Sequence, residues 1–117
     1  MKIIHISDIH LTTPGVPMGG LDPHARLDLA LADIVQNHAD AEWIVITGDL
    51  THWGERAGYE ALVERLARLP MPVRLMIGNH DDRDTFLAVF PDHPKDANGF
   101  INHAETVGDT RFIYLDT

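Results

Sequence analysis

Residues 3–10 read IIHISDIH, an apolar run that is followed at once by an aspartate and a histidine. The isoleucines are β-branched, and such a run is typical of a buried β-strand. Asp8 and His10 stand where that strand should end. The stretch therefore predicts a core strand that carries functional side chains at its carboxyl end.

Two more apolar runs of this kind follow, WIVIT at 43–47 and VRLMI at 73–77, and all three are expected to be strands buried on both faces. Apolar residues at helical spacing predict helices between the runs, over 22–39 and 55–68. The alternation is βαβαβ, an α/β fold in which right-handed crossovers place the helices against a parallel sheet. The remaining predicted elements are a short helix over 82–90 and a last strand over 111–115.

Size and charge narrow the class of protein. The chain has 117 residues, 44% of them hydrophobic, which suits one globular domain over 1–117. Its formal net charge of −9 opposes binding to nucleic acids, which rests on Lys and Arg at the phosphates. No apolar stretch approaches the roughly 20 residues that span a bilayer, and the N-terminus has no secretory pattern. We expect a cytoplasmic protein that binds neither nucleic acid nor membrane.

The histidine and cysteine counts limit the possible metal ligands. The chain has eight histidines and no cysteine. A metal would therefore be held by imidazole nitrogen and by carboxylate and amide oxygen, a set that favours Mn, Fe, Co or Zn over Ca or Mg.

Each of the three predicted core strands is followed by residues that can bind a metal, which are aspartate, asparagine or histidine. The carboxyl ends of parallel strands meet at one edge of the sheet, where α/β proteins bind ligands. Side chains that are far apart in the sequence should therefore converge there. A glycine before the second and third groups allows a tight turn, or one with positive φ. The side chains concerned are Asp8, His10, Asp49, Asn79 and His80.

These residue types suit two divalent metal ions. The carboxylate of Asp49 can give one oxygen to each ion and bridge them at roughly 3.5–4 Å. Asp8 and His10 would hold the first metal, and the Asn79 carbonyl oxygen the second. His80 is better placed as the catalytic donor to the substrate.

The motifs DIH at 8–10, GDLTH at 48–52 and GNHD at 78–81 resemble those of the calcineurin-like metallophosphoesterases. Within that family they are most similar to the bacterial class III cyclic-nucleotide and glycerophosphodiester phosphodiesterases. The resemblance runs through nearly the whole chain. It implies a β-sandwich flanked by helices, and hydrolysis of a small phosphodiester by a hydroxide that bridges two metals. The metal roles it implies for Asp8, His10, Asp49 and Asn79 agree with those above, and His80 would lie near the scissile phosphate.

One feature of the family is missing from the sequence. Family members carry further histidines downstream, including a Gly-His-x-His motif after a second sheet, and these complete both metal shells. Only His93 and His103 follow the third motif here, in a different context. We therefore expect residues 1–117 to be the N-terminal part of a single metallophosphoesterase domain.

Other functions remain open on the sequence. A phosphomonoesterase or protein phosphatase could use the same site, and a non-catalytic scaffold could keep the fold for protein contacts. We expect a homo-oligomer.

Three further expectations concern residues around the motifs. His52 either supports the metal ligands without binding the metal, or lies at the rim of the substrate site, or belongs to a solvated loop. Asp81 is expected to cap the helix that follows it. The Pro/Gly-rich segment 11–21 is long enough to rim a site.

Overall fold

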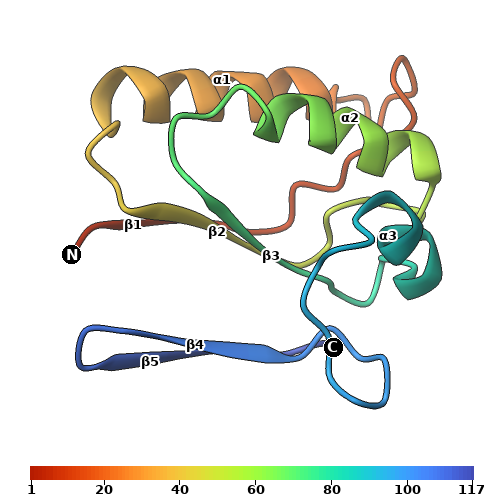
Figure 1. Ribbon diagram of the computed structural model, residues 1–117. Coiled ribbons are helices and arrows are strands. Elements are labelled where there is room, and N and C mark those ends of the chain that lie inside the picture. The colour runs from red at the N-terminus through yellow and green to blue at the C-terminus, as the bar shows by residue number, and fades with distance from the viewer.

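The computed structural model describes residues 1–117 as three layers (Figure 1). The middle layer is a parallel sheet of β1 (Ile3–Ile6), β2 (Trp43–Thr47) and β3 (Val73–Met76), in the order β1-β2-β3. Helices α1 (Pro23–Asn37) and α2 (Arg56–Leu66) cover one face of the sheet. A hairpin of β4 (His103–Val107) and β5 (Thr110–Tyr114) lies on the other side. The predicted βαβαβ order is confirmed.

Burial in the sheet is deepest at its centre. Ile44 and Ile46 of β2 are fully buried, as the sequence predicts. The outer strand β1 differs from the prediction, because His5 is exposed and the isoleucines beside it are only half-buried. Strand β1 pairs with β2 alone, so it lacks a neighbour on its other side.

Helices α1 and α3 begin at residues whose side chains cap them. The carboxylate of Asp22 accepts a hydrogen bond of 3.0 Å from the backbone N–H of His24, and Pro23 occupies the first turn of α1. Helix α3 (Arg83–Val89) is capped by Asp82, which accepts from the N–H of Thr85 at 2.8 Å. The prediction that Asp81 caps this helix is wrong, because the helix begins at Arg83 and its N-cap residue is Asp82.

The hairpin departs most from the prediction. The expected strand at 111–115 is present as β5, but it pairs with the unpredicted β4 in a separate antiparallel sheet. Strand β4 reads HAETV, which lacks the apolar run used to recognise strands. A tertiary contact holds β4 to the parallel sheet: the Arg74 guanidinium donates to the carboxylate of Glu105 at 2.8 Å and holds the pKa of Glu105 below its usual range.

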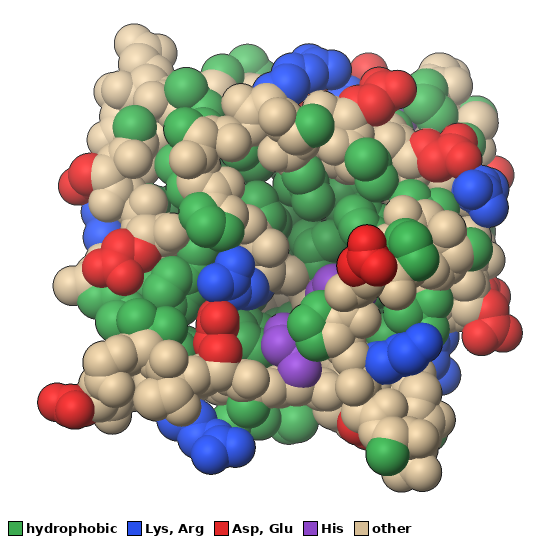
Figure 2. Space-filling model, in the orientation of Figure 1, with side chains coloured by type: hydrophobic (Ala, Val, Ile, Leu, Met, Phe, Trp, Pro, Cys, Tyr) green, Lys and Arg blue, Asp and Glu red, His purple; other side chains and the backbone are tan.

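The hairpin and the sheet enclose further apolar surface. The rings of Trp43 and Phe112 meet edge to face at 4.9 Å between centroids. On the face drawn in Figure 2, hydrophobic side chains gather in the hollow between the helices and the hairpin. None of the helices has the length and the apolar character that crossing a membrane requires.

Candidate metal centre

Only three residues other than glycine have a left-handed backbone, and all are predicted metal ligands. Asp8 has φ 55°, His10 φ 45° and Asp49 φ 47°. Side chains make this conformation unfavourable by roughly 1 kcal/mol or more, and it persists where the surrounding structure enforces it. The three residues follow β1 and β2 directly, so the chain turns sharply at the carboxyl edge of the sheet.

The turns bring the three side chains together. The N–H of Asp8 donates to the carbonyl of Gly48 at 3.3 Å, and the N–H of His10 donates to that of Asp49 at 2.9 Å. Ligand atoms of the three side chains lie within 4.8 Å of one another. Nε2 of His10 is 3.6 Å from Oδ2 of Asp49 and 3.8 Å from Oδ1 of Asp8. Ligands of a single first-row metal, each about 2.0–2.2 Å from the ion, have similar separations.

Asp49 supplies the strongest test of whether a cation fits this site. Only 9% of the residue is exposed, yet no Lys or Arg pairs with its carboxylate, and His10 is the only basic side chain with a nitrogen within 4.0 Å of it. Oδ1 accepts a hydrogen bond of 3.0 Å from the N–H of His80, whereas Oδ2 faces His10. Buried carboxylates are normally paired or bound to metals. The donor set and its charge therefore fit a divalent cation.

The two predicted glycines act in different ways. Gly48 has φ 92°, so it provides the expected turn with positive φ. Gly78 provides space, since a Cβ added there would lie 2.3 Å from Oδ1 of Asp49 and 2.6 Å from its backbone nitrogen. A side chain at position 78 would displace the buried carboxylate.

Asn79 and His80 lie on the turn that follows β3. Asn79 is exposed, and its amide makes no hydrogen bond within the chain. The ring of His80 lies 5.0 Å from that of His10, between centroids, and its Nδ1 donates to the carbonyl of His52 at 2.9 Å. The structure thus brings His80 to the three clustered ligands, and Asn79 precedes it on the same exposed turn.

His52 contacts the site more closely than the sequence indicated. Its Nδ1 is 3.1 Å from Nδ1 of His10, and its ring stacks on that of His80 at 4.8 Å between centroids. It therefore lies beside the candidate ligands, and the solvated-loop alternative is wrong. The only sign of this contact in the sequence is that His52 ends the GDLTH motif, three residues after Asp49.

Asp81 connects the two loops that carry the site. Its carboxylate accepts from the backbone N–H of Leu50, Thr51 and Gly78, at 2.9–3.0 Å, and from the hydroxyl of Tyr59 at 2.9 Å. Burial raises the pKa of that tyrosine. Asp81 thereby fixes the turn after β3 against the turn after β2.

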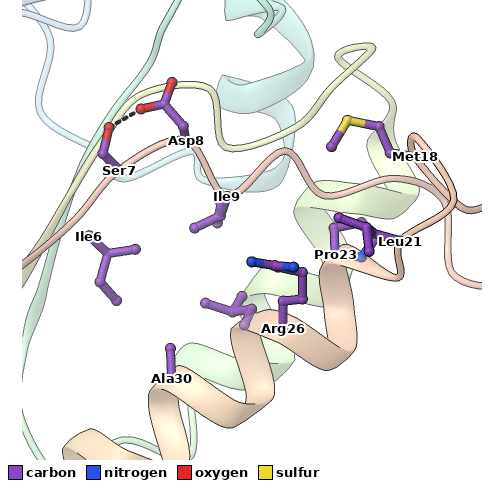
Figure 3. A pocket seen from close by; sticks show the side chains of 10 residues that line it. Ile6, Ser7, Asp8, Ile9, Met18, Leu21, Pro23, Arg26 and Ala30 are labelled. Carbon is purple, nitrogen blue, oxygen red and sulfur yellow. Dashed lines mark hydrogen bonds between the residues drawn. The ribbon is translucent and has the colours of Figure 1, made fainter.

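A cavity of about 370 Å³ adjoins the site at Asp8 (Figure 3). Its walls are the end of β1, the first turns of α1, and Met18 and Leu21 of the long loop. The loop thus lines a cavity that reaches the site at Asp8 only. Figure 3 also shows the Ser7 hydroxyl donating to the Asp8 carboxylate. None of the other candidate ligands lines the cavity.

Comparison with known proteins agrees with this geometry. Residues 1–115 match the family described as Calcineurin-like phosphoesterase. A probable cyclic nucleotide phosphodiesterase of Rhodopseudomonas palustris is 41% identical over the whole chain, which covers 43% of that protein. Another from Rhodococcus erythropolis is 36% identical over 80% of the chain and 34% of its own length. A glycerophosphodiester phosphodiesterase, GpdQ of Enterobacter lignolyticus, is 26% identical over the whole chain and 44% of its length.

The chain thus spans less than half the length of these relatives. The family match nevertheless extends over nearly all of it and includes the ends of all three parallel strands. The chain belongs to the calcineurin-like phosphoesterase family.

Proposed function

We propose that the protein is a metal-dependent phosphodiesterase whose substrates are small phosphodiesters, either cyclic nucleotides or glycerophosphodiesters. The observation that carries the proposal is the buried carboxylate of Asp49, which has no Lys or Arg partner and lies within 4.8 Å of ligand atoms from Asp8 and His10. The names of the relatives support the choice of phosphodiesters over other phosphate esters.

The site would take two divalent ions from among Mn, Fe, Co and Zn. Asp8 and His10 would hold one ion, Asn79 the other, and Asp49 would contribute an oxygen to both. Such ions, when bound, polarise a phosphoryl oxygen and lower the pKa of water to near neutrality. The neutral amide of Asn79 adds a ligand without cancelling positive charge that attracts an anionic phosphate.

His80 would act on the leaving oxygen of the substrate. Because its Nδ1 donates to the His52 carbonyl, Nε2 is the nitrogen left to face a substrate. The side chain is exposed, so a substrate can reach it. In its protonated form it would give a proton from Nε2 to the departing alkoxide.

Hydrolysis of matched substrates tests the proposal. For the full-length protein, we expect Mn²⁺-dependent hydrolysis of cyclic AMP, glycerophosphoethanolamine or bis(p-nitrophenyl) phosphate, and slower hydrolysis of p-nitrophenyl phosphate. Asp49→Asn should abolish turnover, whereas Asp33→Asn, on the exposed face of α1, should leave it unchanged. Faster hydrolysis of the monoester would favour a phosphomonoesterase, and no metal-dependent hydrolysis of any ester would refute the proposal.

A further inference from the structure

The rings of His10 and His52 meet through their Nδ1 atoms. The two Nδ1 atoms are 3.1 Å apart, a hydrogen-bond distance. In a pair of neutral imidazoles, one nitrogen of such a contact must donate and the other must accept. The contact therefore couples the tautomers of the two rings.

The other nitrogen of His10 selects between the two possible tautomers. Nε2 of His10 faces the carboxylates of Asp49 and Asp8, at 3.6 Å and 3.8 Å. A histidine that binds a metal through Nε2 needs its lone pair there, so its proton must sit on Nδ1. Metal-bound histidines almost always donate this second N–H to a fixed acceptor, and loss of the acceptor weakens metal binding.

We propose that His52 is a positioning residue whose Nδ1 accepts the Nδ1–H of His10 and holds the Nε2 lone pair of His10 toward the metal centre. The proton of His52 is then on its Nε2. The inference rests on the proposed metal centre, but it concerns a hydrogen bond between two side chains of this chain.

The surroundings of His52 hold its ring in place for this role. Its ring stacks on that of His80 at 4.8 Å with 20° between the planes, and meets that of Trp53 edge-on at 4.7 Å. Its backbone carbonyl accepts from Nδ1 of His80, and its N–H donates to the carbonyl of Leu11 at 2.9 Å. The backbone and the ring of His52 are thus both held in place. His52 contacts His10 through its Nδ1 and His80 through its backbone carbonyl.

Nitrogen NMR on ¹⁵N-histidine-labelled protein loaded with Zn²⁺ tests the proposal without an activity assay. We expect a scalar coupling between the two Nδ1 nuclei across the hydrogen bond. The chemical shifts should show a protonated Nδ1 in His10 and an unprotonated Nδ1 in His52. Zn²⁺ should shift Nε2 of His10.

Two variants separate the acceptor from the packing of the ring. His52→Phe keeps a ring that can stack on His80 but has no acceptor, so Zn²⁺ affinity should fall by about 10–100-fold. His52→Asn offers a carbonyl oxygen near the position of Nδ1 and should restore most of that affinity. His38→Gln, at the far end of α1, is the control and should bind Zn²⁺ as the wild type does. Amide spectra establish that each variant is folded.

The outcomes distinguish this inference from the proposed function. Zn²⁺ that shifts His10 Nε2 without an N–N coupling, or His52→Phe with unchanged affinity, would overturn the role of His52 alone. Zn²⁺ bound by His10, His52 and His80 together, seen as metal shifts on all three rings, would also overturn it. An unshifted Nε2 of His10 would refute the metal centre and this inference together.

Discussion

Gly78 lies directly against the carboxylate and the backbone of Asp49. Its missing side chain makes room for the Asp49 carboxylate, which a Cβ would approach to 2.3 Å. Gly78→Ala should therefore lower metal affinity sharply and reduce the free energy of unfolding by about 1–3 kcal/mol, as overpacking does. Metal titration and urea unfolding of the same samples measure both effects.

Gly108→Ala is the matched control. Gly108 has φ 60°, but a Cβ there has nothing within 4 Å. It should cost about 1 kcal/mol of stability from the left-handed backbone and leave metal affinity unchanged. Equal metal affinity in Gly78→Ala and the wild type would show that Asp49 is not a ligand or that it can move.

His80 gives a prediction about kinetics. His80→Ala should lower kcat by roughly 10²–10⁴ for an alkyl diester, because a poor leaving group needs protonation. The loss should be much smaller for a nitrophenyl diester, whose leaving group departs unprotonated. Metal content, measured in the same preparations, should not change. Equal losses on the two substrates would exclude proton donation, and loss of a metal would identify His80 as a ligand.

Among the structural elements, the turns after β2 and β3 depend on one carboxylate. Asp81 accepts hydrogen bonds from both turns and from the Tyr59 hydroxyl. Asp81→Ala would leave several partly buried donors without an acceptor, so the free energy of unfolding should fall by about 2–4 kcal/mol. Asp82→Ala, which removes only the cap of α3, should cost about 1 kcal/mol. Equal losses of unfolding free energy in the two variants, measured by denaturant unfolding, would contradict the role assigned to Asp81.

The segment that follows β5 is tied to α3 by a pH-sensitive ion pair. The side chain of Asp116 is 1% exposed and pairs with Arg83 at 2.7 Å, which holds its pKa below the usual range. The folded state thus stays charged at pH values where the unfolded chain takes up a proton. The pair stabilises the fold above the ordinary Asp pKa, and this stabilisation is lost as the pH falls through the lowered value.

Asp116→Asn should therefore reduce stability most near neutral pH, by about 1–3 kcal/mol, because Arg83 is partly exposed and screened by water. The slope of stability against pH on the acid side should flatten. Asp40→Asn, which breaks an exposed pair with Lys2, should change little. A uniform loss at all pH values, measured by urea unfolding from acid to neutral pH, would show that packing rather than charge holds Asp116.

Across the molecule, the sequence predicts the parts whose signals are local. The apolar runs of β1, β2 and β3 and the capping residue Asp22 are readable because strand burial and helix capping depend on neighbouring residues. Strand β4 was missed because HAETV has no apolar run, and its ion pair from Glu105 reaches Arg74, which lies 31 residues away. The roles of His52 and Asp81 depend likewise on contacts between separate loops, which no spacing rule encodes.

The site likewise combines features that follow from the order of the strands with features that do not. Parallel strands deliver their ends to one edge, so the convergence of Asp8, His10 and Asp49 follows from topology. The left-handed backbone of all three residues does not, because Asp and His adopt it only in a small minority of cases. Their position relative to Asn79 likewise depends on how the turn after β3 is held.

A Mn²⁺ titration followed by amide NMR can locate the metal centre on the whole molecule. Paramagnetic broadening falls steeply with distance, so signals of residues 8–10, 48–50 and 78–80 should disappear first. Asp49→Asn should abolish this pattern, and Asp33→Asn should preserve it. Broadening that centres instead on exposed acidic residues such as Asp33 and Asp40, or that survives Asp49→Asn, would contradict a metal centre at the ends of β1, β2 and β3.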